Sequence, residues 1–195
     1  MTAPNVSIQT QASKIRLLLF DVDGVLTDGK VVLYGDGTES KQFDIKDGIA
    51  IVWAQRAGLT VGFLSARTSA STAQRAAQLG VTLVHQGVAN KLDTYEQIVG
   101  DLCEDDEEVA YMGDDIVDLG VLARAGLSAA PADAVEEVRA RVHWVSRAPG
   151  GGGAVRELIE VVLRAQGRWE TLVASYAGNQ SAVPAKPERT RTTKP

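Results

Sequence analysis

Short apolar segments alternate with helical segments along most of this chain. The segments IRLLLF (15–20), TVGFLS (60–65) and EVAYMG (108–113) are each followed by residues with helical spacing. Apolar runs of this length can be buried on both faces, which is typical of strands in a parallel sheet. The alternation therefore predicts an α/β fold in which helices cover both faces of a parallel sheet.

One segment departs from this alternation. KVVLYG (30–35) and TESKQF (38–43) flank a Gly-Asp-Gly sequence, which is a turn signal between two short strands and indicates a β-hairpin. Helices are expected at 47–58, 69–79, 90–102, 115–125, 132–141 and 154–166, with further strands at 81–86, 127–131 and 142–146. We therefore predict a Rossmann-like parallel sheet that carries a small β-hairpin insert.

The two ends of the chain differ in composition from the middle. Residues 1–13 are polar and are predicted to be a flexible leader, while residues 178–195 contain three prolines and four basic residues and are predicted to be disordered. Residues 14–177 then form a single domain, with the hairpin at 29–43.

Charge and cysteine content exclude several functions. The net charge of −5 argues against a nucleic-acid partner, because phosphate backbones are bound by clustered Lys and Arg. Cys103 is the one cysteine, so an internal disulfide and a cysteine zinc site are excluded. The start of the chain has no basic, apolar signal sequence and no apolar stretch is long enough to cross a bilayer, so no membrane association is expected and the cytoplasm is the default compartment.

Polar residues follow the predicted strands. In parallel sheets ligands bind beyond the carboxyl ends of the strands, so these residues are expected to meet at one edge. They are Asp21 and Asp23 after the first strand, Ser65 and Arg67 (with Ala66 between them) after the second, Lys91 after the third, and Asp114, Asp115 and Asp118 after the fourth.

These residue types suit a phosphoryl group and a metal ion. A bare carboxylate cannot approach the negative phosphoryl group unless a cation intervenes, and Asp21 and Asp114 would offer oxygen ligands that Mg²⁺ prefers. Asp21 could then attack in line, while Asp23 could protonate the leaving alkoxide and later take a proton from water. Ser65 and Lys91 would hold the remaining phosphoryl oxygens.

Each of these residues also has a simpler interpretation. Lys91 taken alone would be a solvated residue at a helix start, and Ser65 a helix cap. Asp115 is expected to be a helix cap or to hydrogen-bond to the metal ligands. Asp118 has two interpretations: it orients Lys91 or a metal-bound water, or it lies on a solvated helix face. Arg67 either pairs with a helix or contacts the carboxylate of a sugar acid.

Four motifs in order resemble those of the haloacid-dehalogenase superfamily of phosphatases. They are DVDGVLTD (21–28), Ser65, Lys91 and GDDIVD (113–118), and the resemblance covers residues 15–167. FDIKDG (43–48) and GGGGAVRELI (150–159) resemble a narrower group, the 3-deoxy-D-manno-octulosonate 8-phosphate phosphatases of lipopolysaccharide sugar synthesis.

The resemblance implies roles for individual residues. It implies that Asp21 is the nucleophile, that Asp23 is the acid/base, and that Mg²⁺ binds Asp21, the backbone carbonyl of Asp23 and Asp114. Lys91 is assigned to the catalytic set. Substrate contacts are expected from Ser65, Ala66, Arg67 and Thr27.

The resemblance also implies a homotetramer. The segments between motifs are too short for the cap domain that often closes such active sites, so the hairpin replaces it. We expect the hairpin to pack against neighbouring subunits through Val31, Leu33 and Phe43, and the segment 150–156 to help select the substrate.

The expected activity is hydrolysis of a sugar-acid phosphate, such as 3-deoxy-D-manno-octulosonate 8-phosphate. A nonulosonate 9-phosphate or another small phosphate ester is the nearest alternative substrate. A phosphoacceptor receiver domain is disfavoured, because its acceptor follows the third strand, where this chain has His85-Gln86-Gly87. A noncatalytic oligomerisation domain, related to nucleotide-sugar synthetases, is disfavoured by the intact Asp21, Asp23, Lys91 and Asp114.

Overall fold

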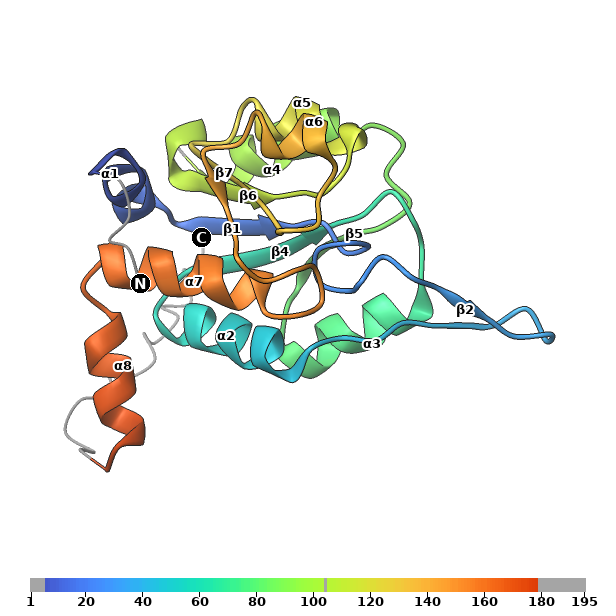
Figure 1. The fold of residues 1–195 in the computed structure, drawn as a ribbon, viewed down its shortest axis with the longest axis horizontal. Coiled ribbons are helices and arrows are strands. Elements are labelled where there is room, and N and C mark those ends of the chain that lie inside the picture. The colour runs from blue at the N-terminus through green and yellow to red at the C-terminus, as the bar shows by residue number, and fades with distance from the viewer. Residues whose placement is uncertain (1–5, 104, 179–195) are drawn as a thin grey trace, which may run out of the picture.

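The computed structural model describes residues 6–103 and 105–178. In this part of the chain, six parallel strands form one sheet in the order β5-β4-β1-β6-β7-β8 (Figure 1). The strands are β1 (Leu17–Phe20), β4 (Thr60–Leu64), β5 (Leu83–His85), β6 (Val109–Met112), β7 (Leu127–Ala130) and β8 (Trp144–Val145). The predicted α/β class is confirmed, and the chain reverses its direction of travel across the sheet beside β1.

The strands on either side of β1 end level with it. Phe20 lies opposite Phe63 of β4 and opposite Met112 of β6. The residues that follow these three strands therefore leave the sheet side by side. This register brings the loops after β1, β4 and β6 together at the carboxyl edge, as expected for a ligand site in an open parallel sheet.

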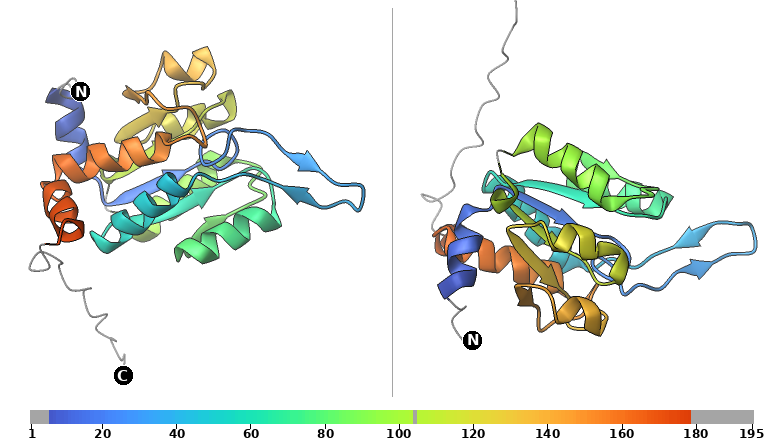
Figure 2. Two further views of the ribbon diagram at one scale, coloured as in Figure 1. Left: turned by 60° about the horizontal axis from the view of Figure 1, so that its bottom comes forward. Right: turned by 90° about the horizontal axis from the view of Figure 1, so that it is seen from above.

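Helices cover both faces of the sheet, and each face has its own core. One face carries α2 (Ile45–Arg56), α3 (Ala70–Leu79) and α7 (Ala154–Ala165), and the other carries α4 (Lys91–Leu102), α5 (Leu119–Leu122) and α6 (Glu136–Arg139) (Figures 1 and 2). Alternate residues of β1 serve the two cores: Leu18 and Phe20 face the first, Leu17 and Leu19 the second. Because β1 is buried on both faces, its end is a rigid platform for Asp21.

The hairpin projects beyond the carboxyl edge of the sheet (Figure 2). Its strands, β2 (Val32–Leu33) and β3 (Glu39–Ser40), pair antiparallel and are shorter than the sequence predicts. Gly37 has a φ of +84°, a conformation that glycine adopts without strain, and it closes the turn at the tip. The hairpin is thus a narrow two-stranded arm.

The prediction of a flexible leader at 1–13 is wrong for the residues that the structure describes. Val6–Lys14 forms a helix, α1, which packs beside α7. Ile8 and Ala12 lie four residues apart on one helical face and are buried. Residues 1–5 of the leader, and 179–195 of the predicted disordered tail, lie outside the described residues.

Two further details differ from the sequence predictions. Helix α2 begins at Ile45 and not at the predicted residue 47, and it is capped by Asp44, whose carboxylate accepts from the backbone of Lys46 and Asp47. Asp47 is instead buried and accepts from the backbone nitrogens of Gly153 (3.2 Å) and Arg156 (2.8 Å), which ties α2 to the start of α7.

An additional helix, α8 (Trp169–Tyr176), follows α7 and was not predicted. The Trp53 Nε1 donates to the Tyr176 hydroxyl at 3.0 Å, and the rings of Trp53 and Trp169 meet edge to face at 5.8 Å. The helix is therefore held against α2. Among the described helices, none is both long and apolar enough to span a membrane.

Candidate active site

The loop after β1 is shaped to approach the loop after β6. Gly24 has a φ of +88°, and a Cβ at this position would lie 2.0 Å from Oδ2 of Asp114. A glycine is needed here for both its backbone conformation and its small size. The close approach places the residues that follow two different strands, Asp21 and Asp114, around a common point.

Thr27, which the sequence predicts to contact the substrate, has its hydroxyl turned into its own loop. Its side chain is fully buried, and its hydroxyl accepts from the backbone nitrogens of Gly24 (3.4 Å) and Gly29 (3.2 Å) and donates to the carbonyl of Val22 (3.3 Å). Thr27 therefore closes the loop after β1 from within. Hydroxyl side chains make such local contacts with backbone groups in many turns.

Three carboxylates converge at the edge of the sheet. Asp21, Asp114 and Asp118 each offer an oxygen, and these atoms all lie within 4.8 Å of one another. The Asp118 oxygens are already engaged: Oδ1 accepts from Lys91 Nζ at 2.7 Å, and Oδ2 accepts from the Asp114 backbone nitrogen at 3.1 Å. By contrast, the buried Oδ1 of Asp114 has no hydrogen-bond partner among the described residues. Asp21 and Asp114 therefore fit a divalent ion, and Asp118 serves the neighbouring groups.

Lys91 lies between two of these carboxylates. Its ammonium is 2.9 Å from Asp21 Oδ1 and 2.7 Å from Asp118 Oδ1, and its side chain is almost completely buried. The helix start holds it there, because Asn90 caps α4 by accepting from the Leu92 backbone nitrogen at 3.1 Å. Burial acts to lower the pKa of Lys91, but the charges of Asp21 and Asp118 outweigh it and raise this pKa. Lys91 is therefore a permanent cation of the site.

The remaining negative charge exceeds what Lys91 can balance. Burial, together with the charge of Asp118, raises the pKa of Asp21 to about 6, against the opposing effect of Lys91. Burial and the charges of Asp21 and Asp118 raise the pKa of Asp114 to about 8. Carboxylates crowded in this way ionise fully when a divalent cation joins them. The electrostatics and the unpaired oxygen of Asp114 both indicate a site for a divalent cation.

This electrostatic imbalance leads to a testable prediction. Because the pKa values of Asp21 and Asp114 are raised in the folded state, the metal-free protein holds protons that the unfolded chain has released. Its free energy of unfolding should therefore fall as the pH rises from the unfolded-state pKa of about 4 through the folded-state value of about 8 for Asp114.

Thermal melting with EDTA or with saturating MgCl₂ measures this effect. Mg²⁺ should raise the melting temperature strongly at pH 8 and little at pH 5.5, since protonated carboxylates bind metal poorly. The variant Asp114→Asn should lose most of the Mg²⁺-dependent increase. An equal increase at both pH values, retained in Asp114→Asn, would place the ion elsewhere.

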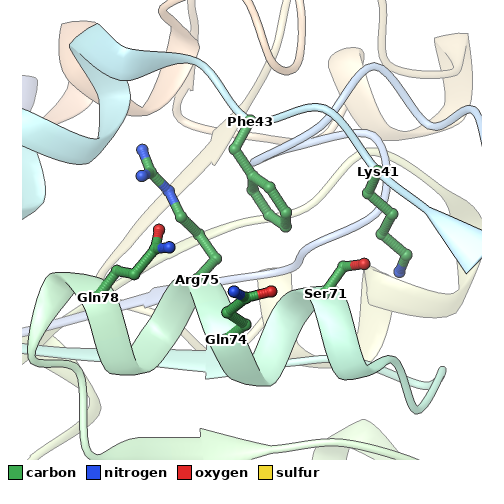
Figure 3. Close-up of a pocket in the computed structure, with 6 residues that line it drawn as sticks. All are labelled: Lys41, Phe43, Ser71, Gln74, Arg75 and Gln78. Carbon is green, nitrogen blue, oxygen red and sulfur yellow. The ribbon is translucent and has the colours of Figure 1, made fainter.

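These groups line a hollow of about 260 Å³. Its lining residues are Asp21, Asp23, Gly29, Ser65, Ala66, Arg67, Lys91, Asp114, Asp115 and Val117. A second hollow, of about 290 Å³, lies at the base of the hairpin over α3 (Figure 3) and is lined by Lys41, Phe43, Ser71, Gln74, Arg75 and Gln78. The second hollow contains no acidic residue and none of the predicted catalytic groups, so the first is the candidate active site.

Three other predicted site residues line this hollow and make local contacts. Ser65 is buried, and its hydroxyl accepts from the Arg67 backbone nitrogen at 3.2 Å. Arg67 is half exposed, and its guanidinium lies 2.9 Å from Glu39. Asp115 caps the short helix η2 (Ile116–Asp118) by accepting from the Ile116 nitrogen at 2.7 Å. The structure thus brings these residues together, while their roles stay predictions.

Two site residues were not found by sequence reasoning. Tyr111 is buried in β6, and its hydroxyl donates to Asp118 Oδ1 at 2.5 Å, which supports Asp118 from below. Its signal was a tyrosine in an otherwise apolar strand, since a buried hydroxyl usually has a partner. Lys41, from the hairpin, lies 2.7 Å from Asp23 Oδ1, and nothing in the sequence pattern distinguishes it from other hairpin lysines.

Comparisons with known proteins agree on one family. Haloacid dehalogenase-like hydrolases match residues 81–158. The 3-deoxy-D-manno-octulosonate 8-phosphate phosphatase of Escherichia coli K12 is 39% identical over 164 residues, which are 84% of this chain and 87% of that protein.

Solved structures give the same result. The 3-deoxy-D-manno-octulosonate 8-phosphate phosphatase of Yersinia pestis superposes with a TM-score of 0.83 at 38% identity, covering 85% of this chain and 89% of that one. The enzyme of the same name from Moraxella catarrhalis, in complex with magnesium, phosphate and KDO, has a TM-score of 0.85 at 32% identity, covering 87% and 97%.

The fold and the carboxylate–lysine site define a haloacid dehalogenase-like hydrolase, in which Mg²⁺ is the cofactor. Within that class, the chain belongs to the 3-deoxy-D-manno-octulosonate 8-phosphate phosphatase family. It is therefore a phosphatase, as its motifs predicted, and its sheet and hairpin match the predicted architecture.

Proposed function

We propose that this phosphatase hydrolyses 3-deoxy-D-manno-octulosonate 8-phosphate through a phosphorylated Asp21. The observation that carries the proposal is the meeting of Asp21, Asp114 and Lys91 at one edge of the sheet, with Lys91 2.9 Å from Asp21. This is the set of charges that an in-line attack on a phosphoryl group requires. The substrate is suggested by relatives of that name at 39% identity over 87% of their length.

The reaction would proceed in two steps. In the first, an Asp21 oxygen attacks phosphorus, the bond from phosphorus to the sugar oxygen breaks, and Asp23 gives its proton to the departing alkoxide. In the second, Asp23 takes a proton from water as the water oxygen attacks phosphorus and releases Asp21. Bound between Asp21 and Asp114, Mg²⁺ would supply the charge neutralisation that lets a carboxylate approach the phosphate.

Other residues of the hollow would hold the substrate. Lys91 and the hydroxyl of Ser65 would contact the phosphoryl oxygens that do not face the metal. Arg67 is half exposed at the rim, so its guanidinium is free to swing towards the carboxylate of a sugar acid, which it can bind in a bidentate manner. Ala66, between Ser65 and Arg67 in the chain, also lines the hollow.

A panel of small phosphate esters tests this function. With Mg²⁺ present, 3-deoxy-D-manno-octulosonate 8-phosphate should give the highest kcat/KM, and EDTA should remove the activity. A nonulosonate 9-phosphate that exceeds it would reassign the substrate but keep the class of enzyme. Failure to hydrolyse any ester of the panel would contradict the proposed function.

We also propose that the protein is a homotetramer, in which the hairpin packs against neighbouring subunits. The supporting observation is its exposed apolar surface: Val32 is 50% exposed, Leu33 75% and Tyr34 52%. Apolar side chains gathered on a projecting arm are typical of an interface. Phe43, which the sequence assigned to this contact, is half-buried against the core of its own subunit instead.

The substitution Leu33→Asp tests the assembly. A charge at the centre of an apolar contact should shift the protein to smaller species in light scattering at micromolar concentration, and it should raise KM if a neighbour completes the pocket. Lys30→Asp, an exposed change nearer the base of the same arm, is the matched control and should leave the mass unchanged. A wild-type monomer, or a Leu33→Asp tetramer, would contradict the proposal.

A further inference from the structure

A buried lysine of the hairpin lies against the proposed acid/base residue. The ammonium of Lys41 is 2.7 Å from Oδ1 of Asp23 and 2.9 Å from Oδ2. The Lys41 side chain has no exposed surface, whereas the Asp23 side chain is 19% exposed. A lysine that gives up its hydration so completely must gain strong charge-assisted contacts in return, and Asp23 provides them.

Two further charges complete a closed ring. Arg67 lies 2.9 Å from Glu39 and 3.8 Å from Asp23, and Lys41 lies 3.9 Å from Glu39. The ring alternates in sign and joins the loop after β1, the returning strand of the hairpin and the loop after β4. Its members differ in access, because the Arg67 side chain is 52% exposed while the Lys41 side chain has no exposed surface.

This difference in access separates two tasks. Arg67 can leave the ring to meet a substrate, whereas Lys41 is enclosed and remains on Asp23. Figure 3 shows that Lys41 leaves the same segment between β3 and α2 as Phe43 and that its side chain extends down towards α3. Phe43 is itself packed against the core, so the backbone is anchored two residues beyond Lys41.

We propose that Lys41 is a positioning residue, which holds the Asp23 carboxyl group in reach of the leaving oxygen and so makes the hairpin part of the catalytic apparatus. Asp23 would otherwise be free to rotate towards Arg67 or solvent. The proposal rests on the assignment of Asp23 as the acid of the first step. Lys41 acts on the reaction only through Asp23, and this restriction separates it from a residue that merely stabilises the fold.

Leaving groups of different basicity test the proposal. The alkoxide of 3-deoxy-D-manno-octulosonate 8-phosphate needs a proton to depart, whereas the nitrophenolate of p-nitrophenyl phosphate leaves readily without one. kcat/KM reports the step that forms the aspartyl-phosphate, in which the two esters differ. Lys41→Met should lower kcat/KM for the sugar phosphate about tenfold more than for the aryl phosphate, a part of the ~10²–10⁴-fold that a positioned acid contributes.

A double-mutant cycle gives the second readout. In an Asp23→Asn background, Lys41→Met should lower kcat/KM for the sugar phosphate hardly any further, because the group that Lys41 positions can no longer act as an acid. Lys41→Arg, which keeps the charge, should recover part of the sugar-phosphate activity. Lys46→Met, an exposed change at the start of α2, is the matched control and should resemble the wild type.

Each outcome decides a separate point. If Lys41→Met lowers kcat/KM equally for both esters, or if its loss in kcat/KM adds to that of Asp23→Asn, the positioning role is overturned and Lys41 is a structural residue. If Asp23→Asn itself lowers kcat/KM equally for both esters, Asp23 is not the acid of the first step. The positioning proposal, which rests on that assignment, is then contradicted as well. If Lys41→Met and Asp23→Asn each lower kcat/KM selectively for the sugar phosphate, and their effects do not add, the acid role of Asp23 and the positioning role of Lys41 are both supported.

Discussion

The variant Asp21→Asn is expected to have no measurable turnover, at least about 10⁴-fold below the wild type, since an amide is not a nucleophile for the phosphoryl group. Asp21 occupies the end of the central strand, with its oxygen 2.9 Å from Lys91. The substitution keeps the size of the side chain. It also removes a buried negative charge whose pKa is already raised to about 6 by burial and by Asp118. The metal-free variant should therefore melt no lower than the wild type at pH 8.

A matched substitution separates chemistry from general damage. Asp28 lies in the same loop, with its side chain 45% exposed and paired with Lys30 at 3.0 Å. Asp28→Asn should keep the wild-type kcat, because such exposed pairs contribute little. Steady-state kinetics with the octulosonate ester compares the two variants. Activity in Asp21→Asn within tenfold of the wild type would show that Asp21 is not the nucleophile.

Lys91→Met is expected to damage both catalysis and stability. The substitution leaves Asp21 and Asp118 facing each other without the ammonium that now lies 2.9 Å and 2.7 Å from them. Breaking a buried ion pair by removing one partner typically costs about 3–5 kcal/mol. kcat should also fall about 10²–10³-fold, because one donor to the phosphoryl oxygens is lost.

Two measurements on Lys91→Met follow. Urea unfolding in EDTA at pH 8 gives the loss in free energy of unfolding, and single-turnover kinetics with Mg²⁺ gives the loss in rate. Lys91→Arg should recover most of the stability but less of the rate, because the guanidinium fork does not fit the space of one ammonium. An unchanged free energy of unfolding would mean that Lys91 is not the counter-ion of the two carboxylates.

Sequence alone predicted the central part of this molecule because periodic patterns carry that information. The fully apolar β1 and its neighbours have the length and composition of buried parallel strands, and their ends determine where Asp21, Ser65 and Asp114 emerge. Lys91 followed from the same logic, as a charged residue at a helix start beside that edge. The class of fold and the acidic site therefore needed no tertiary information.

Other features depend on contacts between residues distant in sequence. Lys41 and Asp23 are brought together only by the path of the hairpin. From the sequence alone, a lysine in such an arm would be predicted to be exposed to solvent. Thr27 is a polar residue near the site whose partners are backbone groups of its own loop. Helix α1 has few apolar residues, and its burial became visible only with α7 beside it. Tertiary packing overrode the local pattern in each case.

The central claim is that the phosphoryl group passes through the Asp21 carboxylate. Borohydride reduces an acyl phosphate to an alcohol, so an aspartyl-phosphate trapped during turnover becomes homoserine. The trap is best applied to Asp23→Asn with p-nitrophenyl phosphate and Mg²⁺, since that variant lacks the base that speeds hydrolysis of the intermediate. Mass spectrometry of the peptide that contains residue 21 should then find homoserine in place of Asp21. Homoserine at another aspartate, or an unmodified Asp21 in protein that is turning over substrate, would contradict the account.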